Sequence, residues 1–334
     1  MPGLHGGFTS YIIRRVAFSV VVFFAVIILN FLIPRLMPGD PIARLILTMP
    51  QLTPEQREIL IARFGLDKPL HEQFILYIVN MFKGDFGISY LFYPEPVTSV
   101  ILDRLPWTIA LMSISTMLSS IIGIFLGMFA GWRQGSKLDL TISYTSLIFW
   151  ATPTFWLGMV LLLIFGFYLG MFPLGGITSP ELIYTSFLDL IIDYLHHSTL
   201  PIITLTLVNL ASYVLVMRNS MVSILGEDFI VTAKAKGLPE RQVLFKHAAR
   251  NAILPTVTLV GLNFGFVAGG AVLTETVFSY PGIGRLMYVA VAGNDYPLIQ
   301  GIFFMLAVMV ILANFITDLI YVKLDPRVKY GRGY

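Results

Sequence analysis

The sequence contains no cysteine and few charged residues. Without cysteine the chain can form no disulfide, no thiolate metal site and no cysteine nucleophile. Lys, Arg, Asp and Glu together make up 12% of the residues, whereas about a quarter is typical of soluble domains. Hydrophobic residues make up 56%, the mean hydropathy is +0.80, and several uncharged runs are long enough to cross a bilayer. This composition predicts a membrane protein.

Common catalytic patterns are also missing from the sequence. It has no Gly-x-x-x-x-Gly-Lys-Ser/Thr phosphate loop, no His-Glu-x-x-His and no Gly-x-Ser-x-Gly. His196 and His197, near Asp193, form one candidate metal site, but adjacent histidines on a polar turn are more often solvated. We therefore expect no catalytic residue, no metal ligand and no cofactor bound by this chain.

The long apolar runs predict an all-α polytopic fold with six transmembrane helices. Arg14 and Arg15 precede the first run, which is too long for a signal peptide and ends in a Pro-rich segment. We expect Pro153 to bend the third helix and Pro201 to lie in the first turn of the fourth. The predicted spans cover about 11–33, 105–132, 140–169, 199–218, 251–274 and 296–320.

Residues 34–104 form a more polar insertion between the first two spans. Thr53 to Gln56 reads as a capping box with Pro54 at the first helical position, and this helix should stop near Gly65. A second helix should run from about Pro69 to 83–84. The insertion either caps the helix ends or forms a platform for an extracellular binding protein, and the sequence leaves both readings open.

Two predicted spans carry glycine at every fourth residue, a pattern that we call a glycine ladder. Small residues at this spacing line one helix face and allow close approach of another helix, either within the chain or in a partner subunit. The first ladder consists of Gly123, Gly127 and Gly131, and the second of Gly261, Gly265 and Gly269.

Uncharged polar residues within the spans are candidates for lining a lumen, above all Ser113, Asn209 and Asn263. The alternative for each is a hydrogen bond to a neighbouring helix, which contributes roughly 0.6 kcal/mol. Asp318 is the one acidic residue that we place close to a span interior. This scarcity of buried charge argues against a proton-coupled carrier.

The distribution of Lys and Arg predicts the orientation. Positive charges concentrate in the link at 133–139, in the loop at 223–250 and in the C-terminal tail, whereas 169–200 contains none. The positive-inside rule therefore places both termini and the 223–250 loop in the cytoplasm of a multi-pass plasma (inner) membrane protein.

The 223–250 loop, which we call the elbow, has the local pattern of two short helices joined by a hinge. Glu227 and Asp228 suit a helix N-terminus, Gly237 suits a left-handed C-cap, and Pro239 suits the start of a second helix. Ala233 and Ala235 offer a small surface that another protein could approach closely. An ordered loop of this length is uncommon unless it binds something.

The elbow resembles the EAA loop of ATP-binding-cassette importer permeases, through TAKAKG at 232–237, HAARN at 247–251 and Leu254-Pro255. Val231, Thr232 and Ala233 replace the general Glu-Ala-Ala, and the Gly-to-Pro spacing is wider, as in the dipeptide/oligopeptide/nickel branch. IPRLMPGDP at 33–41, FGLDKPL at 64–70, GDFGIS at 84–89, ETVFSYPGIG at 275–284 and LDPR at 324–327 also resemble that branch.

The resemblance implies a type I importer permease fold, built as a single membrane domain over 1–334 with an extracellular helical insertion. It also implies that this chain is the first of two paired permease subunits embedded in membrane lipid. The expected partners are two ATPase subunits, which bind ATP and Mg, and an extracellular solute-binding protein. No nucleic acid is expected to bind. The residues implied to couple this chain to the ATPase are Thr232, Ala233, Lys234, Ala235, Lys236, Gly237, Leu238, Pro239, Glu240 and Arg241.

The resemblance implies dipeptides or oligopeptides as cargo, with oligosaccharides or nickel as alternatives. A different class, a stand-alone secondary carrier or a membrane enzyme, would not need the elbow. The elbow is thus the feature that separates the two classes.

Overall fold

The computed structural model describes residues 8–36, 53–64, 67–265, 267 and 270–324, and the statements below concern these residues. They are helical, apart from loops and one isolated antiparallel bridge between Ile88 and Pro96. The chain divides into two compact units. Unit 1 comprises Met1–Thr108 with Gly282–Tyr334, and unit 2 comprises Ile109–Pro281.

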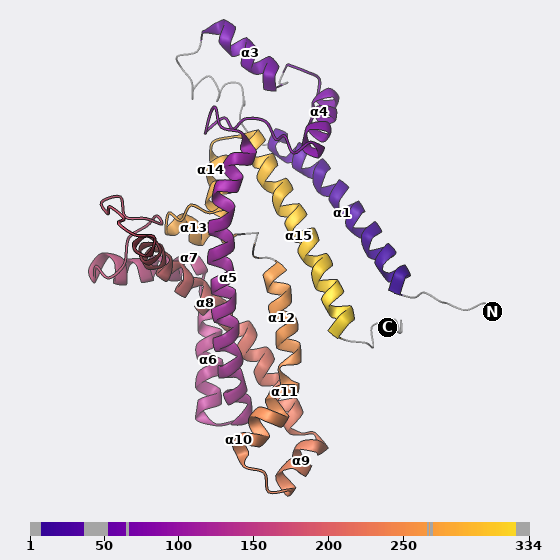
Figure 1. Ribbon diagram of the computed structural model, residues 1–334, viewed down its shortest axis with the longest axis vertical. Coiled ribbons are helices and arrows are strands. Elements are labelled where there is room, and N and C mark those ends of the chain that lie inside the picture. The colour runs from indigo at the N-terminus through magenta and orange to yellow at the C-terminus, as the bar shows by residue number, and fades with distance from the viewer. Residues whose placement is uncertain (1–7, 37–52, 65–66, 266, 268–269, 325–334) are drawn as a thin grey trace, which may run out of the picture. The chain divides into compact units, whose positions relative to one another are not determined.

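Unit 1 contains the first and last helices of the chain, and α1 lies against both α15 and α4 (Figure 1). Pro69 precedes α4 and Lys83 caps it, so the two helices expected in the insertion are confirmed. Its elements are α1 (Phe8–Leu36), α3 (Pro54–Phe64), α4 (Leu70–Phe82), the first part of α5 (Val97–Trp132), α14 (Ile283–Ala292) and α15 (Tyr296–Leu324).

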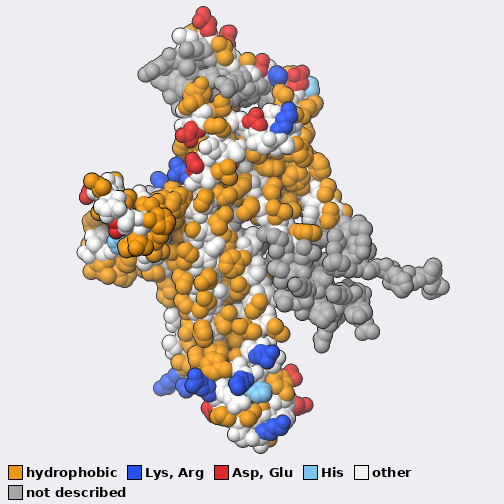
Figure 2. Space-filling view, viewed as in Figure 1, with side chains coloured by type: hydrophobic (Ala, Val, Ile, Leu, Met, Phe, Trp, Pro, Cys, Tyr) orange, Lys and Arg blue, Asp and Glu red, His pale blue; other side chains and the backbone are white. Residues whose placement is uncertain are grey.

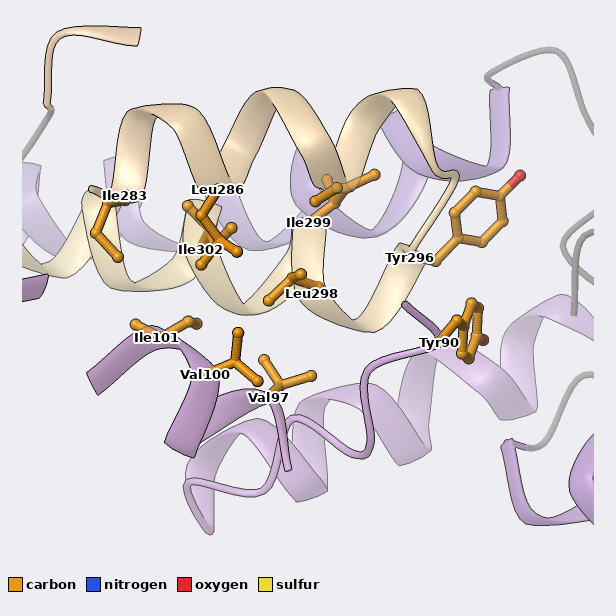
Figure 3. Close-up of a cluster of buried hydrophobic side chains, with 11 residues drawn as sticks. Tyr90, Val97, Val100, Ile101, Ile283, Leu286, Tyr296, Leu298, Ile299 and Ile302 are labelled. Carbon is orange, nitrogen blue, oxygen red and sulfur yellow. The ribbon is translucent and has the colours of Figure 1, made fainter. Parts of the chain in front are cut away.

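A buried apolar cluster holds the start of α5 against α14 and α15 (Figure 3). Val97 from α5, Ile283 from α14 and Ile299 from α15 are all inaccessible to solvent. Asp295, also fully buried, accepts hydrogen bonds from the backbone N–H groups of Leu91 and Leu298. The polar bonds thus fasten the 84–96 turn to the beginning of α15.

Unit 2 carries the remaining part of α5 and the longest helix of the chain, α8 (Figure 1). Its helices α6 and α8 make the most extensive contact between elements. The other elements are α6 (Lys137–Ala151), α7 (Thr154–Leu161), the π-helix η1 (Leu162–Tyr168), α8 (Phe187–Leu225), α9 (Asp228–Ala235), α10 (Glu240–Gln242), the π-helix η2 (Val243–Ala248), α11 (Ala249–Ala252), α12 (Leu254–Gly265) and α13 (Val272–Val277).

The third predicted span is broken at Thr152 and Pro153. The expected bend is confirmed, but at 98° between the two helices it is far sharper than a kink within one span. Thr152 adopts an extended backbone, and Pro153 has no N–H with which to continue the ladder of α6. Residues 140–169 are therefore not one straight helix.

The fourth predicted span is longer than expected at its beginning. α8 starts at Phe187, where Ser186 and Asp189 form a complete capping box, so Pro201 lies inside the helix. Our placement of Pro201 in the first turn was wrong. We took the start of the apolar run as the start of the helix, and that run begins only after the polar residues at 193–198. The same correction puts His196 and His197 on a helix instead of a polar turn.

The fifth predicted span, 251–274, is also not a single helix. α12 ends at Gly265, Gly270 has a φ of +69°, and α13 begins at Val272 after the non-helical Ala271. Glycine destabilises a helix interior and readily adopts positive φ, which explains the end of the helix in this glycine-rich stretch.

Three helices in the described part of the chain are long and apolar enough to cross a membrane, or four if the bent pair counts as one span. They include Val16–Ile33 within α1, Val97–Trp132 and Phe187–Leu225. α15 is apolar over its first part, Tyr296–Leu312. The protein is thus an all-helical membrane protein with several apolar spans, and the count of six remains a prediction.

Candidate functional site

The elbow folds as its local sequence predicts. Glu227 is the N-cap of α9, Lys236 is its C-cap, and Gly237 follows with a φ of +74°. Pro239 then caps α10, which continues into η2 and α11. The expected pair of helices with a left-handed glycine between them is confirmed, and η2 adds a π-helical turn that the sequence did not reveal.

One side of α9 is fixed to the chain's own core. Ile230 and Ala233 are buried in a cluster with Met217 and Met221 of α8 and Val243 of η2. Our expectation that Ala233 belongs to an accessible surface was wrong, since its side chain is 4% exposed and faces this cluster. The buried pair anchors α9 to the end of α8, so the elbow is rigidly connected to that helix.

The other side of α9 is accessible and includes apolar groups. Phe229 is 40% exposed and Val231 is 60% exposed. Lys234 also reaches back to the ring of Trp132, with its Nζ atom 5.7 Å from the ring centroid. Of the other residues expected to contact the ATPase, Leu238 is half-buried, and the exposed ones are Thr232, Lys234, Ala235, Lys236, Gly237, Pro239, Glu240 and Arg241.

The elbow surface carries a surplus of positive charge. Residues 227–250 include five Lys and Arg and three Asp and Glu. Figure 2 shows Lys and Arg side chains gathered at the end of unit 2 where the elbow and the α5–α6 turn lie. This distribution fits the positive-inside expectation for a cytoplasmic loop.

The first glycine ladder lies against α8. A β-carbon added at Gly123 would lie 2.5 Å from the Cβ atom of Tyr213, and one at Gly131 would lie 2.5 Å from that of Met221. At Gly127 it would meet the backbone oxygen of Val214 at 2.5 Å. All three glycines therefore permit a backbone approach within this chain.

The second ladder has a different environment. A β-carbon added at Gly261 would meet no described atom within 4 Å, and Gly265 ends α12 in a half-buried position. Gly269 lies outside the described residues. The described part of unit 2 thus places no helix against Gly261.

A partly buried ion pair, which sequence reasoning missed, joins α6 to α8 near the elbow. Arg218 donates from Nε to Asp139 Oδ1 at 2.6 Å and from Nη2 to Oδ2 at 2.7 Å. Asp139 is 1% exposed and also accepts from the backbone N–H of Gly135. Our predicted fourth span, 199–218, ended at Arg218, and we assigned that residue no partner; Asp139 in the first turn of α6 was the available signal.

Our expectation of scarce buried charge therefore needs correction. Besides Asp139, Glu275 on α13 is fully buried, and it accepts a hydrogen bond from the backbone N–H of Ala271. The side chain of Asp318 lies outside the described residues. The argument against a proton-coupled carrier consequently cannot rest on an absence of buried carboxylates.

The three lumen candidates have different surroundings. Asn263 Nδ2 donates to the Tyr213 hydroxyl at 2.7 Å. This is a hydrogen bond to a neighbouring helix, the alternative that we gave to a lumen role. Asn209 is exposed on α8, and Ser113 is half-buried on α5. Asn209 is therefore the most exposed of the three candidates in this chain.

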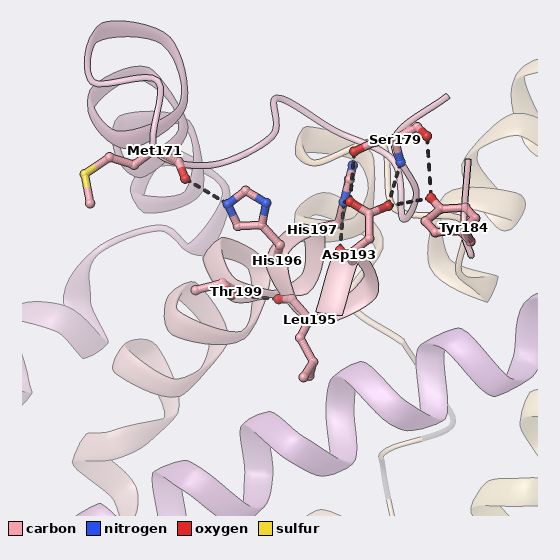
Figure 4. A network of polar contacts seen from close by, with 8 residues as sticks. All are labelled: Met171, Ser179, Tyr184, Asp193, Leu195, His196, His197 and Thr199. Atoms are coloured by element: carbon pink, nitrogen blue, oxygen red, sulfur yellow. Dashed lines mark hydrogen bonds and ion pairs between the residues drawn. The ribbon is translucent and has the colours of Figure 1, made fainter. Parts of the chain in front are cut away.

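His196 and His197 do not converge on one point. His196 Nε2 lies 2.8 Å from the carbonyl oxygen of Met171, whereas His197 Nδ1 lies 3.3 Å from Asp193 Oδ1 (Figure 4). Asp193 also accepts hydrogen bonds from Ser179 and from the Tyr184 hydroxyl. This network fastens the 172–186 loop to the beginning of α8, and the described residues contain no group of three potential metal ligands.

The fold and the elbow define a class of protein, namely a helical membrane component of a transport system. The model of the family "Binding-protein-dependent transport system inner membrane component" matches residues 123–330, and the model of its N-terminal part matches residues 8–112. The chain belongs to this family. It is thus a multi-pass inner-membrane permease subunit of an ATP-binding-cassette transporter. Such a subunit has no ATPase site of its own and carries no cofactor. The transport system also includes a binding protein and a separate ATPase.

Individual relatives match nearly the whole chain. The "Oligopeptide transport system permease protein AppB" of Bacillus subtilis is 38% identical over 96% of this chain and 99% of the relative. The "Dipeptide transport system permease protein DppB" of Escherichia coli K12 is 35% identical over 97% of this chain and 99% of the relative.

A solved structure has a similar fold. The MetNI methionine ABC transporter in an inward-facing conformation matches with a TM-score of 0.53 and 19% identity, over 68% of this chain and 96% of that chain. This likeness supports an ATP-binding-cassette importer permease fold.

Proposed function

We propose that the chain is the first of two paired permease subunits of a peptide importer and forms half of the path for dipeptides or oligopeptides. The observation that carries this proposal is the similarity to the AppB and DppB relatives over almost the full length of both chains. Oligosaccharides and nickel are the alternative cargoes.

A binding assay on the importer's solute-binding protein tests the cargo class. We expect dipeptides or oligopeptides to raise its melting temperature in a thermal-shift screen that also includes oligosaccharides and Ni²⁺, because bound ligand stabilises the folded state. Stabilisation by a sugar or by Ni²⁺ alone would refute the peptide assignment.

We also propose that α9 docks on the ATPase and transmits its movement to α8. Phe229 and Val231 support this proposal, since apolar side chains exposed on an ordered polar segment are typical of a protein interface. The buried side of α9 supplies the mechanical connection, because Ile230 and Ala233 pack on Met217 and Met221.

The exposed apolar side chains offer the direct test of docking. Val231→Asp should leave the permease folded but reduce co-purification of the ATPase, because it puts a charge into an apolar contact. Gln134→Asp, on the exposed turn between α5 and α6, is the matched control at the same end of unit 2. Normal ATPase binding and substrate-stimulated hydrolysis in the Val231 variant would remove α9 from the interface.

Gly237 provides a second test, aimed at transmission. Gly237→Val forces a β-branched residue into a left-handed conformation, which costs at least about 1–2 kcal/mol. Gly237→Asn is the control, since asparagine tolerates that conformation. We expect the valine variant to uncouple hydrolysis from transport and the asparagine variant to remain coupled.

For orientation, we propose six spans with both termini and the elbow in the cytoplasm. The chain has no cysteine, so single cysteines can be introduced without background. A cysteine at Ile183, which is 92% exposed, should react with an impermeant thiol reagent added outside intact cells, and one at Gln134 should not. The reverse pattern would invert the topology.

The second glycine ladder supports a contact with the paired permease. Gly261 leaves an open helix face in this chain, and small residues at that spacing suit close packing of membrane helices. We propose that Gly261, Gly265 and Gly269 face the second permease subunit, whereas Gly123, Gly127 and Gly131 serve packing within this chain.

We also propose that Asn209 and Ser113 line the translocation path.

A further inference from the structure

A cavity of about 320 Å³ lies within unit 1, at the end of α1. Its walls come from α1, α3, α4, the turn at 85–87 and the first turns of α15. The volume falls within the range of about 300–1,000 Å³ that is usual for small-molecule sites. None of the residues discussed for the elbow contributes to it.

The cavity carries both signs of charge. Arg35 and Lys68 line it together with Asp85. The Arg35 guanidinium donates to Gln73 Oε1 and to the carbonyl oxygen of Phe31, and among the ion pairs of the described residues it has no carboxylate partner. Asp85 accepts one hydrogen bond, from the backbone N–H of Gly87, and remains exposed.

Neutral polar groups at the cavity are held in place by a buried network. Asn30 Nδ2 donates to the Tyr77 hydroxyl at 2.9 Å and to the backbone oxygen of Gln300 at 2.8 Å. Burial raises the pKa of Tyr77 to about 12, so the hydroxyl keeps its proton and can act as a donor. Tyr77 thus presents a fixed polar group to the cavity.

Gln300 supplies the second indication of a ligand. Its side chain lines the cavity, the residue is 8% exposed, and its Nε2 atom has no hydrogen-bond partner among the described residues. A buried amide without a partner costs about 1–3 kcal/mol, and a turn of the Gln300 side chain toward the cavity would let a bound acceptor relieve that cost, because Nε2 itself is inaccessible to solvent. Leu76, Phe86 and Pro297 complete the wall with apolar surface.

From this combination we propose that the cavity binds a small zwitterion of dipeptide size. Arg35, Lys68 and Tyr77 would receive the carboxylate, Asp85 the ammonium group, and Gln300 the amide oxygen. A simple anion would leave Asp85 unused, and a simple cation would meet two positive charges. The identification of this zwitterion with the transported peptide rests on the proposed function, and the cavity would then hold cargo on the side of the membrane where the binding protein releases it.

The proposal is tested with the full chain in nanodiscs and with L-alanyl-L-alanine as the probe. We expect saturable binding by calorimetry, with weaker binding of both the N-acetylated dipeptide and the dipeptide amide. Each analogue lacks one of the two charges. Equal affinity for all three compounds, or no saturable binding of the dipeptide, would overturn the proposal.

Two variants locate the charges. Lys68→Gln should weaken dipeptide binding about three- to tenfold. It should leave binding of the dipeptide amide unchanged, because the amide has no carboxylate for Lys68 to contact. Asp85→Asn should weaken dipeptide binding similarly and spare the N-acetylated form. Lys83→Gln and Glu95→Gln, exposed residues outside the cavity, are the matched controls.

Two further measurements separate the possible failures. In the first, phosphatidylglycerol is added to the nanodisc as a competitor of the dipeptide. If it displaces the dipeptide, and if the Lys68 and Asp85 variants change the affinity for the lipid and not for the dipeptide, the cavity is a lipid-headgroup site and the proposal is overturned. Transport is assayed in parallel with the binding protein and ATPase present. Peptide transport without cavity binding overturns the cavity alone, whereas cavity binding without peptide transport overturns the proposed function alone.

Discussion

Comparison of α5 with α12 shows one sequence pattern in two environments. On α5, each ladder glycine lies so close to α8 that an added β-carbon would come within 2.5 Å of another atom. On α12, a β-carbon at Gly261 would meet no described atom within 4 Å. Glycine at every fourth residue therefore predicts that a helix face can be approached, but it does not say by which helix.

The two alanines of α9 repeat this contrast at the elbow. Ala233 is buried against α8 and η2, whereas Ala235, two residues further on, is exposed. Both are small residues in the same motif. Their different environments separate side chains that hold the elbow together from side chains that are available to a partner.

The largest effect is expected at the first ladder. Gly127→Val puts a branched side chain against the backbone of α8, which cannot move aside, and should cost about 3 kcal/mol, near the upper end for overpacking. The melting temperature of the purified permease measures it. Gly261→Val is the matched control, and equal losses at both positions would contradict the difference between the ladders.

The alanine pair comes next. Ala233→Asp buries an unpaired polar group in the cluster around Met217 and Met221 and should cost about 2 kcal/mol. Ala235→Asp should leave the melting temperature unchanged and reduce ATPase co-purification instead. If the Ala233 variant melts like the parent and loses only the ATPase, Ala233 is an interface residue after all.

A smaller effect is expected for Asn263. Asn263→Leu removes the hydrogen bond to Tyr213 and should destabilise the permease by about 1 kcal/mol. Tyr213→Phe removes the same bond from the other side, so the double variant should lose little more than either single variant. A transport defect with unchanged stability would instead favour the lumen role for Asn263.

The smallest effect has the opposite sign. Gly261→Ala fills open space on a helix, and alanine is favoured over glycine there by about 0.5–1 kcal/mol. The isolated permease should therefore melt slightly higher. If the face meets the second permease, assembly of the complex should weaken at the same time, and unchanged assembly would show that the face contacts lipid.

Local sequence signals predicted the elbow well, because they act within a few residues. Glu227, Gly237 and Pro239 each favour a particular backbone position regardless of what packs on them, and each has that position in the structure. The orientation of Ala233 could not be predicted in this way. It depends on Met217 and Met221, which reach it only through the packing of α9 on α8.

Hydrophobic runs located the helices but not their limits. The Ser186 and Asp189 capping box was present in the sequence and could have revealed the start of α8. The 98° break at Pro153 and the end of α12 at Gly265 were harder to predict, because proline and glycine also occur inside continuous membrane helices.

The π-helix η2 lets the stretch from the elbow to α12 hold one extra residue. A π-helical turn contains one more residue than an α-helical turn would need, so it resembles an insertion tolerated in a continuous helix. Deleting one residue from 243–248 would let the segment revert to an α-helix, and the residues after it would keep their faces, because the wider turn offsets the rotation of about 100° that one residue adds to an α-helix. Asn263 would then still meet Tyr213, and Gly261 would present the same side of α12. Homologous chains that differ here by a single-residue gap would thus be expected to keep the same pattern of small and polar residues along α12.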